Sequence, residues 1–179
     1  GVVTFKNIFE MTSADWSWVM GVNLGGVING VSVFLPLMVD AEKGGHIVNT
    51  SSSAGLFGIP GLASYCASKT AVVGLSEHLR GDLEELKIGV SVLCPGGVAT
   101  NIVDAGRSRP SRFGGPESLN EDAKQTAVGI AQGLGPDVVA EMIMEGVRNN
   151  ELYIMTHADI RIPVEARLEA LRSAYEVNA

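Results

Sequence analysis

Two short apolar segments with a helical stretch between them constrain the fold of this chain most. Residues 46–50 follow a Gly44-Gly45 turn and are expected to form a strand, and residues 90–94 are expected to form a second one. The first segment leads into Ser51-Ser52-Ser53 and the second into Pro95-Gly96-Gly97. Because open α/β sheets bind ligands at the carboxyl ends of their strands, this pattern predicts a site built from both segments.

Tyr65 and Lys69 lie four residues apart in the expected helix between the strands, so their side chains share one face. A free tyrosine has a pKa of about 10 and is a poor base at neutral pH. Lowering that pKa by about three units takes roughly 4 kcal/mol, which one ammonium about 4 Å away supplies at an effective dielectric of about 20. The spacing therefore suits a proton-transferring pair, although it also occurs in amphipathic helices that carry a solvated lysine.

Four motifs in a fixed order resemble the short-chain dehydrogenase/reductase family. They match its helix Asn, its Ser after a strand, its Tyr-x-x-x-Lys and its Pro-Gly-x-Val-x-Thr. In this chain they are Asn23, Ser52, Tyr65 with Lys69, and Pro95-Gly96-Gly97-Val98-Ala99-Thr100. The resemblance implies an α/β, Rossmann-like doubly wound parallel sheet. Residues 1–179 would form a single domain that corresponds to the C-terminal two-thirds of a family subunit.

The resemblance also assigns roles to these residues. It implies that Tyr65 is the general acid or base, that Ser52 polarises the substrate oxygen, and that Lys69 lowers the pKa of Tyr65 and binds the nicotinamide ribose. It implies that Asn23 holds a water in a proton relay to Lys69. The expected reaction interconverts a secondary alcohol and a ketone by hydride transfer with NAD or NADP. The residues expected at the cofactor are Gly1, Tyr65, Lys69, Pro95, Gly96, Val98 and Thr100.

The family's glycine-rich turn, which receives the cofactor pyrophosphate, has no counterpart in these 179 residues. We therefore expect an N-terminally truncated member that lacks the first strands and helices of the sheet. NAD and NADP stay equally possible, because the residue that distinguishes them follows the second strand. Two alternatives stay open: a catalytically inactive fragment that acts only through subunit association, and an epimerase or dehydratase, which shares Tyr-x-x-x-Lys.

Composition argues against several other functions. The chain is 46% hydrophobic and 18% charged, as globular domains are, and its net charge of −7 argues against a nucleic-acid surface. We expect no membrane partner, because no apolar run looks long enough to span a bilayer, and a cytoplasmic location, because no signal peptide is visible. No metal site is expected, since Cys66, Cys94 and the three histidines lack metal-ligand spacing.

Two long helices are expected, over residues 13–41 and 65–86, and Pro36 should bend or end the first of them. The family resemblance implies that these helices form a homodimer or homotetramer. Residues 100–125 are expected to be an irregular substrate loop. Beyond it, residues 136–149 are expected to be a helix and residues 152–155 a strand. Residues 164–179 are expected to be a charged helix, either on the surface or in a subunit contact.

Overall fold

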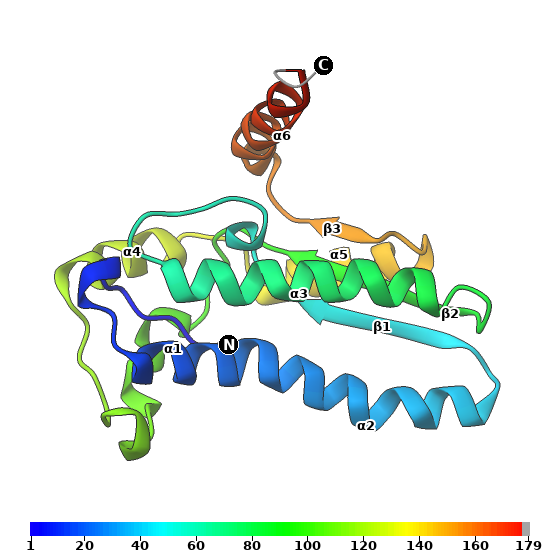
Figure 1. Cartoon of the computed structure of the whole chain (residues 1–179), viewed down its shortest axis with the longest axis horizontal. Coiled ribbons are helices and arrows are strands. Elements are labelled where there is room, and N and C mark those ends of the chain that lie inside the picture. The colour runs from blue at the N-terminus through cyan, green and yellow to red at the C-terminus, as the bar shows by residue number, and fades with distance from the viewer. Residues whose placement is uncertain (177–179) are drawn as a thin grey trace.

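The centre of the molecule is a sheet of three parallel strands (Figure 1). The computed structural model describes residues 1–176 of the chain. The strands are β1 (Gly45–Thr50), β2 (Ile88–Cys94) and β3 (Tyr153–Met155), and β2 lies between the other two. In this register Asn49 lies opposite Val92, and Leu93 lies opposite Ile154. The three predicted strands are therefore confirmed, with small shifts at their ends.

The side chains of β2 alternate between two layers of helices, as successive strand residues point to opposite faces. On one face, Val92 packs in a cluster with Val72 of α3 (Ala63–Asp82). On the other face, Leu93 packs with Val139 of α5 (Pro136–Arg148). Helices thus cover both faces of the parallel sheet, which confirms the predicted doubly wound α/β arrangement.

The first long helix is not uniform. It consists of α1 (Ser13–Met20), a π-helical turn (Gly21–Gly25) and α2 (Gly26–Ala41). Of the two expectations for Pro36, a bend or an end of the regular helix, the second is wrong, because α2 continues to Ala41. In a regular helix, an N–H at position 36 would donate to the Ser32 carbonyl, and proline has no N–H. Ser32 and Pro36 both lie on the exposed side of the helix, so water can reach this carbonyl.

The segment after β2 is irregular up to residue 120, as predicted, and contains the short 3-10 turns Ile102–Ser108 and Ser111–Phe113. The prediction missed α4 (Glu121–Ala131). Asn120 begins this helix by accepting a hydrogen bond from the Ala123 N–H at 2.8 Å, and two acidic residues occupy the first turn. This combination is a recognisable start signal, so the residues held information that the prediction did not use.

Among the described residues, one helical stretch, Ser13–Ala41, is long and apolar enough to cross a bilayer by length and composition, with a mean hydropathy of 1.7. The expectation that no such run exists was therefore wrong. Core helices of soluble proteins pass the same test. One side of α2 packs through Val31, Leu35 and Met38 against the cluster around Leu79 and Val90. The stretch thus has a protein-packed side and an exposed apolar side.

Beyond β3, a 3-10 turn (Ala158–Ile160) leads into α6 (Arg161–Glu176), which extends away from the sheet (Figure 1). The predicted C-terminal helix is confirmed as far as Glu176. Residues 177–179 of that prediction lie outside the described part of the chain.

Candidate active site

The two segments that follow β1 and β2 lie side by side. Hydrogen bonding continues past the strand ends, from the Ser51 N–H to the Leu93 carbonyl and from the Ser53 N–H to the Pro95 carbonyl, both at 2.8 Å. The serine segment and the Pro-Gly segment therefore meet at one edge of the sheet, where the sequence places a site. The Tyr65 end of α3 is held against the same edge, because the Ser51 hydroxyl donates to the Lys69 carbonyl at 2.8 Å.

A cavity of about 640 Å³ opens at this edge. Its walls are largely apolar and include Phe5, Ile59, Leu62 and Ile130, while its polar groups gather near the strand ends. All but one of the residues predicted for the site line this cavity. They are Gly1, Ser52, Tyr65, Lys69, Pro95, Gly96, Val98 and Thr100.

Tyr65 is half-buried in the wall of the cavity. Burial raises the pKa of its phenol, whereas the neighbouring Ser52 hydroxyl acts in the opposite direction. The Lys69 ammonium lies 5.6 Å from the centre of the Tyr65 ring. The lowered tyrosine pKa expected from the Tyr-x-x-x-Lys spacing is thus not what these surroundings produce. Desolvation of the phenolate is the largest cause of the raised pKa.

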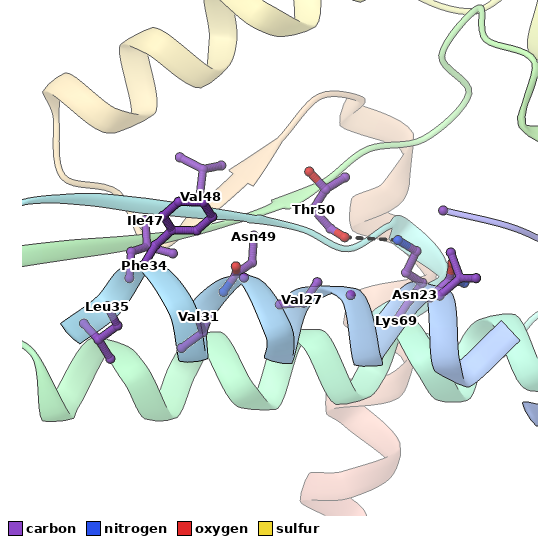
Figure 2. A pocket seen from close by; sticks show the side chains of 14 residues that line it. Asn23, Val27, Val31, Phe34, Leu35, Ile47, Val48, Asn49, Thr50 and Lys69 are labelled. Carbon is purple, nitrogen blue, oxygen red and sulfur yellow. Dashed lines mark hydrogen bonds between the residues drawn. The ribbon is translucent and has the colours of Figure 1, made fainter. Parts of the chain in front are cut away.

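Lys69 is almost fully buried, with 4% of its surface exposed. Its ammonium donates a hydrogen bond to the Thr50 carbonyl at 3.0 Å, which ties α3 to the end of β1 (Figure 2). Burial lowers the pKa of Lys69 to about 8. The charge of this residue therefore changes close to neutral pH.

Asn23 is the predicted residue that does not line this cavity. It lies in the π turn between α1 and α2 and is buried. Its amide nitrogen donates to the Val2 carbonyl at 2.9 Å and to the Ser68 hydroxyl at 3.0 Å, while its oxygen accepts from the Val2 N–H at 2.7 Å. The side chain thus links the N-terminal segment to α3, one residue away from Lys69.

A second cavity of about 440 Å³ lies between α2 and the free edge of β1 (Figure 2). Val27, Val31 and Phe34 of α2 line one side of it, and residues of β1 line the other. Lys69 and Gly1 line both cavities. The buried lysine therefore stands between the site at the strand ends and the open side of the sheet.

The sequence did not identify several neighbours of the site. Phe5 and Thr126 line the main cavity although they belong to none of the motifs, whereas Arg107, which also lines it, falls within the predicted substrate loop. Gly96 packs on His157, where a Cβ atom would come within 2.9 Å of the imidazole ring. The position of His157 directly after the last strand was a usable signal, because the carboxyl ends of parallel strands share one edge of the sheet.

The loop after β2 is fixed to α1 by charged side chains. Arg109 is buried and forms ion pairs with Asp15 at 2.6 Å and with Glu117 at 2.8 Å. Lys6 bridges the same two carboxylates, at 2.9 Å to Asp15 and 2.6 Å to Glu117. These bonds position the segment whose Val103 and Arg107 form a wall of the cavity.

The described residues include no group of three or more His, Cys, Asp or Glu side chains that could hold a metal ion. Cys66 and Cys94 are free thiols. Burial raises the pKa of the Cys94 thiol to about 11, so it stays protonated at neutral pH. The polar groups available for chemistry at the main cavity are therefore hydroxyls, backbone groups, the Asn101 amide, the Arg107 guanidinium and the Lys69 ammonium.

A parallel sheet with a Ser, Tyr and Lys at its carboxyl edge defines a dehydrogenase-like α/β fold, and comparison with known proteins identifies the family. The family described as short chain dehydrogenase matches residues 1–110, and the chain belongs to it.

Individual relatives agree with this assignment. The chain is 39% identical over 173 residues to a C alpha-dehydrogenase of a Sphingobium species, and 29% identical over 157 residues to a 3-oxoacyl-[acyl-carrier-protein] reductase of Thermotoga maritima. These alignments cover 96% and 86% of this chain, but only 57% and 58% of the relatives.

A solved short chain dehydrogenase/reductase from Burkholderia phymatum, in complex with NAD, superposes with a TM-score of 0.91 at 38% identity. The superposition covers 97% of this chain and 64% of that protein. The chain therefore spans a little over half the length of these relatives.

Proposed function

We propose that this chain carries the catalytic part of an NAD- or NADP-dependent oxidoreductase that interconverts a secondary alcohol and a ketone. The observation that carries the proposal is the convergence of Ser52, Tyr65 and Lys69 on one cavity at the carboxyl ends of β1 and β2. A phenol beside a serine hydroxyl, with an ammonium 5.6 Å from the centre of its ring, is suited to proton transfer at a substrate oxygen. Residues 1–179 would act as one domain.

The residues around the cavity fit the nicotinamide end of such a cofactor, which when bound supplies or accepts the hydride. Thr50 takes one of the three donors of the Lys69 ammonium, which leaves two for ribose hydroxyls. A Cβ atom placed on Gly97 would meet nothing within 4 Å, so a flat ring has room to approach the backbone there. Gly1, Pro95, Gly96, Val98 and Thr100 would complete this part of the site.

Tyr65 would exchange a proton with the substrate oxygen while a hydride moves to or from the substrate carbon. In ketone reduction, the phenol protonates the oxygen as the carbon gains the hydride. In alcohol oxidation, the phenolate takes the hydroxyl proton as the carbon loses the hydride. Because burial raises the pKa of Tyr65, neutral pH favours the phenol, the form that reduction needs. Ser52 would hold the substrate oxygen beside the phenol.

Asn23 would act by positioning in this scheme. Its side-chain hydrogen bonds to Val2 and Ser68 fix the start of the chain against α3. This places Gly1 close to Lys69, since a Cβ on Gly1 would lie 3.4 Å from the ammonium. A water relay to Lys69, if Asn23 supports one, would therefore use its backbone, because its amide is already engaged.

Substrate selection would fall to the segment from residue 100 to residue 125 and to the start of the chain. The cavity walls they provide include Phe5, Ile102 and Val103, which are apolar. We therefore place an apolar substituent of the alcohol or ketone against them.

We further propose that the exposed sides of α2 and α3 form the contact of a homodimer or homotetramer. On α2, the exposed apolar residues include Val33, Phe34 and Leu37. They lie in the helical stretch that is long and apolar enough to cross a bilayer. Contact with a second subunit would bury an apolar surface that water disfavours.

Titration of the chain with NADH and with NADPH, followed by nicotinamide fluorescence, tests the proposal first. Saturable binding to either one is the expected result, and the preferred one identifies the cofactor. A ketone screen then compares Tyr65→Phe with Tyr153→Phe, a control on the exposed surface. Tyr65→Phe should lower turnover by about 10²–10⁴-fold, since general acid catalysis contributes that factor. Tyr153→Phe should leave turnover unchanged.

Two results would contradict the proposal. The absence of cofactor binding even at millimolar concentration would favour a non-catalytic role through subunit association. Full turnover in the Tyr65→Phe protein would assign proton transfer to another group.

A further inference from the structure

The helix α6 lies apart from the rest of the molecule (Figure 1). All of its residues from 165 to 176 are exposed. Its base is attached through Val164, which packs on the core cluster around Val72, and through Arg167, which donates to the Leu56 carbonyl at 2.7 Å. A helix of this length is marginally stable in water by itself, so one surface of α6 should be covered by protein.

The sequence of α6 indicates which surface that is. Val164, Leu168, Leu171 and Tyr175 follow one another at spacings of four, three and four residues. This is the a/d pattern of a helix that packs along another helix. Leu168 is 55% exposed, Leu171 50% and Tyr175 80%. The stripe is narrow, which suits a two-helix seam better than a flat surface.

Charges on either side of the stripe identify the partner and its direction. Glu165 and Arg172 flank one side of the stripe, and Arg167 flanks the other. A parallel second copy would place Arg167 of one helix against Arg172 of the other, which is repulsive. An antiparallel second copy would place Glu165 of each helix near Arg172 of the other, which is attractive twice over.

Glu165 and Arg172 each form an ion pair within α6 that a second helix could replace. Within α6, Glu165 pairs with Arg161 at 3.2 Å and Arg172 pairs with Glu169 at 3.1 Å. All four side chains are well exposed, so these pairs contribute little and their charges can serve a second helix as well.

We propose that α6 packs antiparallel against α6 of a second copy of this chain, around a two-fold axis between the helices. The contact is isologous, because the same stripe serves both copies. It lies across the molecule from α2 and from the N-terminus (Figure 1), so it is separate from a contact through α2 and α3.

Hydrogen exchange of the α6 amides and the mass of the assembly by sedimentation together test this pairing in the intact chain. Amides of residues 165–176 should gain protection as protein concentration rises, because pairing suppresses helix opening. Leu168→Glu and Leu171→Glu should abolish that protection and lower the mass. Ser173→Glu introduces the same charge on the opposite side of α6 and should change neither.

A charge exchange tests the direction of the helices. Glu165→Arg alone should weaken pairing, as should Arg172→Glu alone, and the double variant should restore it. Fast exchange of α6 at every concentration in the unmodified chain would overturn the proposal. So would equal protection in the Leu168→Glu and Ser173→Glu proteins. Failure of the double variant to recover would overturn the antiparallel arrangement.

Discussion

Lys69 is one of three charged residues that are almost completely buried in the described part of the chain. Its ammonium is buried beside the end of β1, and burial holds its pKa at about 8, below the ordinary value of 10.5. Below pH 8 the folded chain must keep a charged ammonium out of water, and above about pH 10.5 that cost is absent. The residue therefore opposes folding at neutral pH and stops doing so as the pH rises through this window.

Replacing Lys69 should remove this pH dependence. A pKa lowered from 10.5 to about 8 corresponds to roughly 3 kcal/mol. The stability of the unmodified chain should thus rise, relative to Lys69→Met, between pH 8 and pH 10.5. Urea unfolding of both proteins across that range measures the difference. Lys43→Met, at an exposed position, is the matched control and should follow the unmodified chain. The expectation would be contradicted if the free energy of unfolding changed with pH in the same way in all three proteins.

At the scale of elements, Gly55 controls how closely the turn after β1 approaches α3. An added Cβ would come within 2.5 Å of the Ser51 hydroxyl and 2.8 Å of the Lys69 carbonyl oxygen. Any side chain at this position would push the serine segment away from the helix that carries Tyr65. Glycine is required here by close packing, not by an unusual backbone angle.

Gly55→Ala should destabilise the chain by about 1–3 kcal/mol, as overpacking typically does. Gly129→Ala is the control, because Gly129 lies within α4 with open space around it. That change should stabilise the chain by about 0.5–1 kcal/mol, because alanine favours a helix more than glycine does. Thermal unfolding measures both. The prediction fails if the two variants shift the unfolding temperature in the same direction.

The ion pairs between α1 and the loop after β2 also connect elements, and their centre is the buried Asp15 carboxylate. Hydrogen bonds from Thr12, Lys6 and Arg109 hold the pKa of the buried Asp15 carboxyl well below its usual range, although desolvation alone would raise it. The stability that these bonds provide is present above the ordinary carboxyl pKa and is lost as the pH falls through the lowered one.

Arg109→Leu should therefore cost about 3–5 kcal/mol at neutral pH, because it leaves a buried carboxylate with fewer partners. Glu121→Gln breaks an exposed pair with Lys124 and should cost less than about 1 kcal/mol. Denaturant unfolding at pH 7 compares them. A second change, Asp15→Asn, should recover part of the Arg109→Leu loss. Its failure to do so would show that Arg109 acts mainly by packing on Trp18, whose ring lies 5.3 Å from the guanidinium.

Local pattern predicted the elements well and their connections less well. Apolar periodicity and turn residues within a short window predict the three strands and the helices α3, α5 and α6. The Ser, Tyr and Lys of the site could be placed because strand order fixes where strand ends meet. The Arg109 network could not be predicted, because its members are spread from residue 6 to residue 117 and only tertiary packing joins them. The pKa of Tyr65 was misjudged for the same reason, since burial is a property of the folded chain.

At the scale of the whole molecule, exposed apolar side chains gather on the outer side of α2 as well as on α6. Phe34 and Leu37 are 63% and 61% exposed, and Phe34 borders the cleft along the free edge of β1 (Figure 2). This surface should drive self-association of the chain.

Phe34→Lys combined with Leu37→Lys should reduce light scattering on concentration without lowering the unfolding temperature. Val31→Lys, on the inner side of the same helix, should lower that temperature sharply because it places a charge against the core. Unchanged scattering in the double variant would show that association uses another surface.

The π-helical turn at Gly21–Gly25 lies within a row of inward-facing residues that are spaced four apart along the chain. Inward-facing positions recur every four residues, at Asp15, Val19, Asn23, Val27, Val31, Leu35 and Val39. In an ideal α-helix each step of four overshoots one turn by about 40°, so six steps would carry the row about 240° around the axis. A π turn takes up an additional residue and cancels about 100° of that drift, so the row turns about 140° and stays on one broad side of the helix. A long row of inward-facing residues spaced four apart thus indicates an extra residue in one turn of a helix. Here that turn contains Asn23.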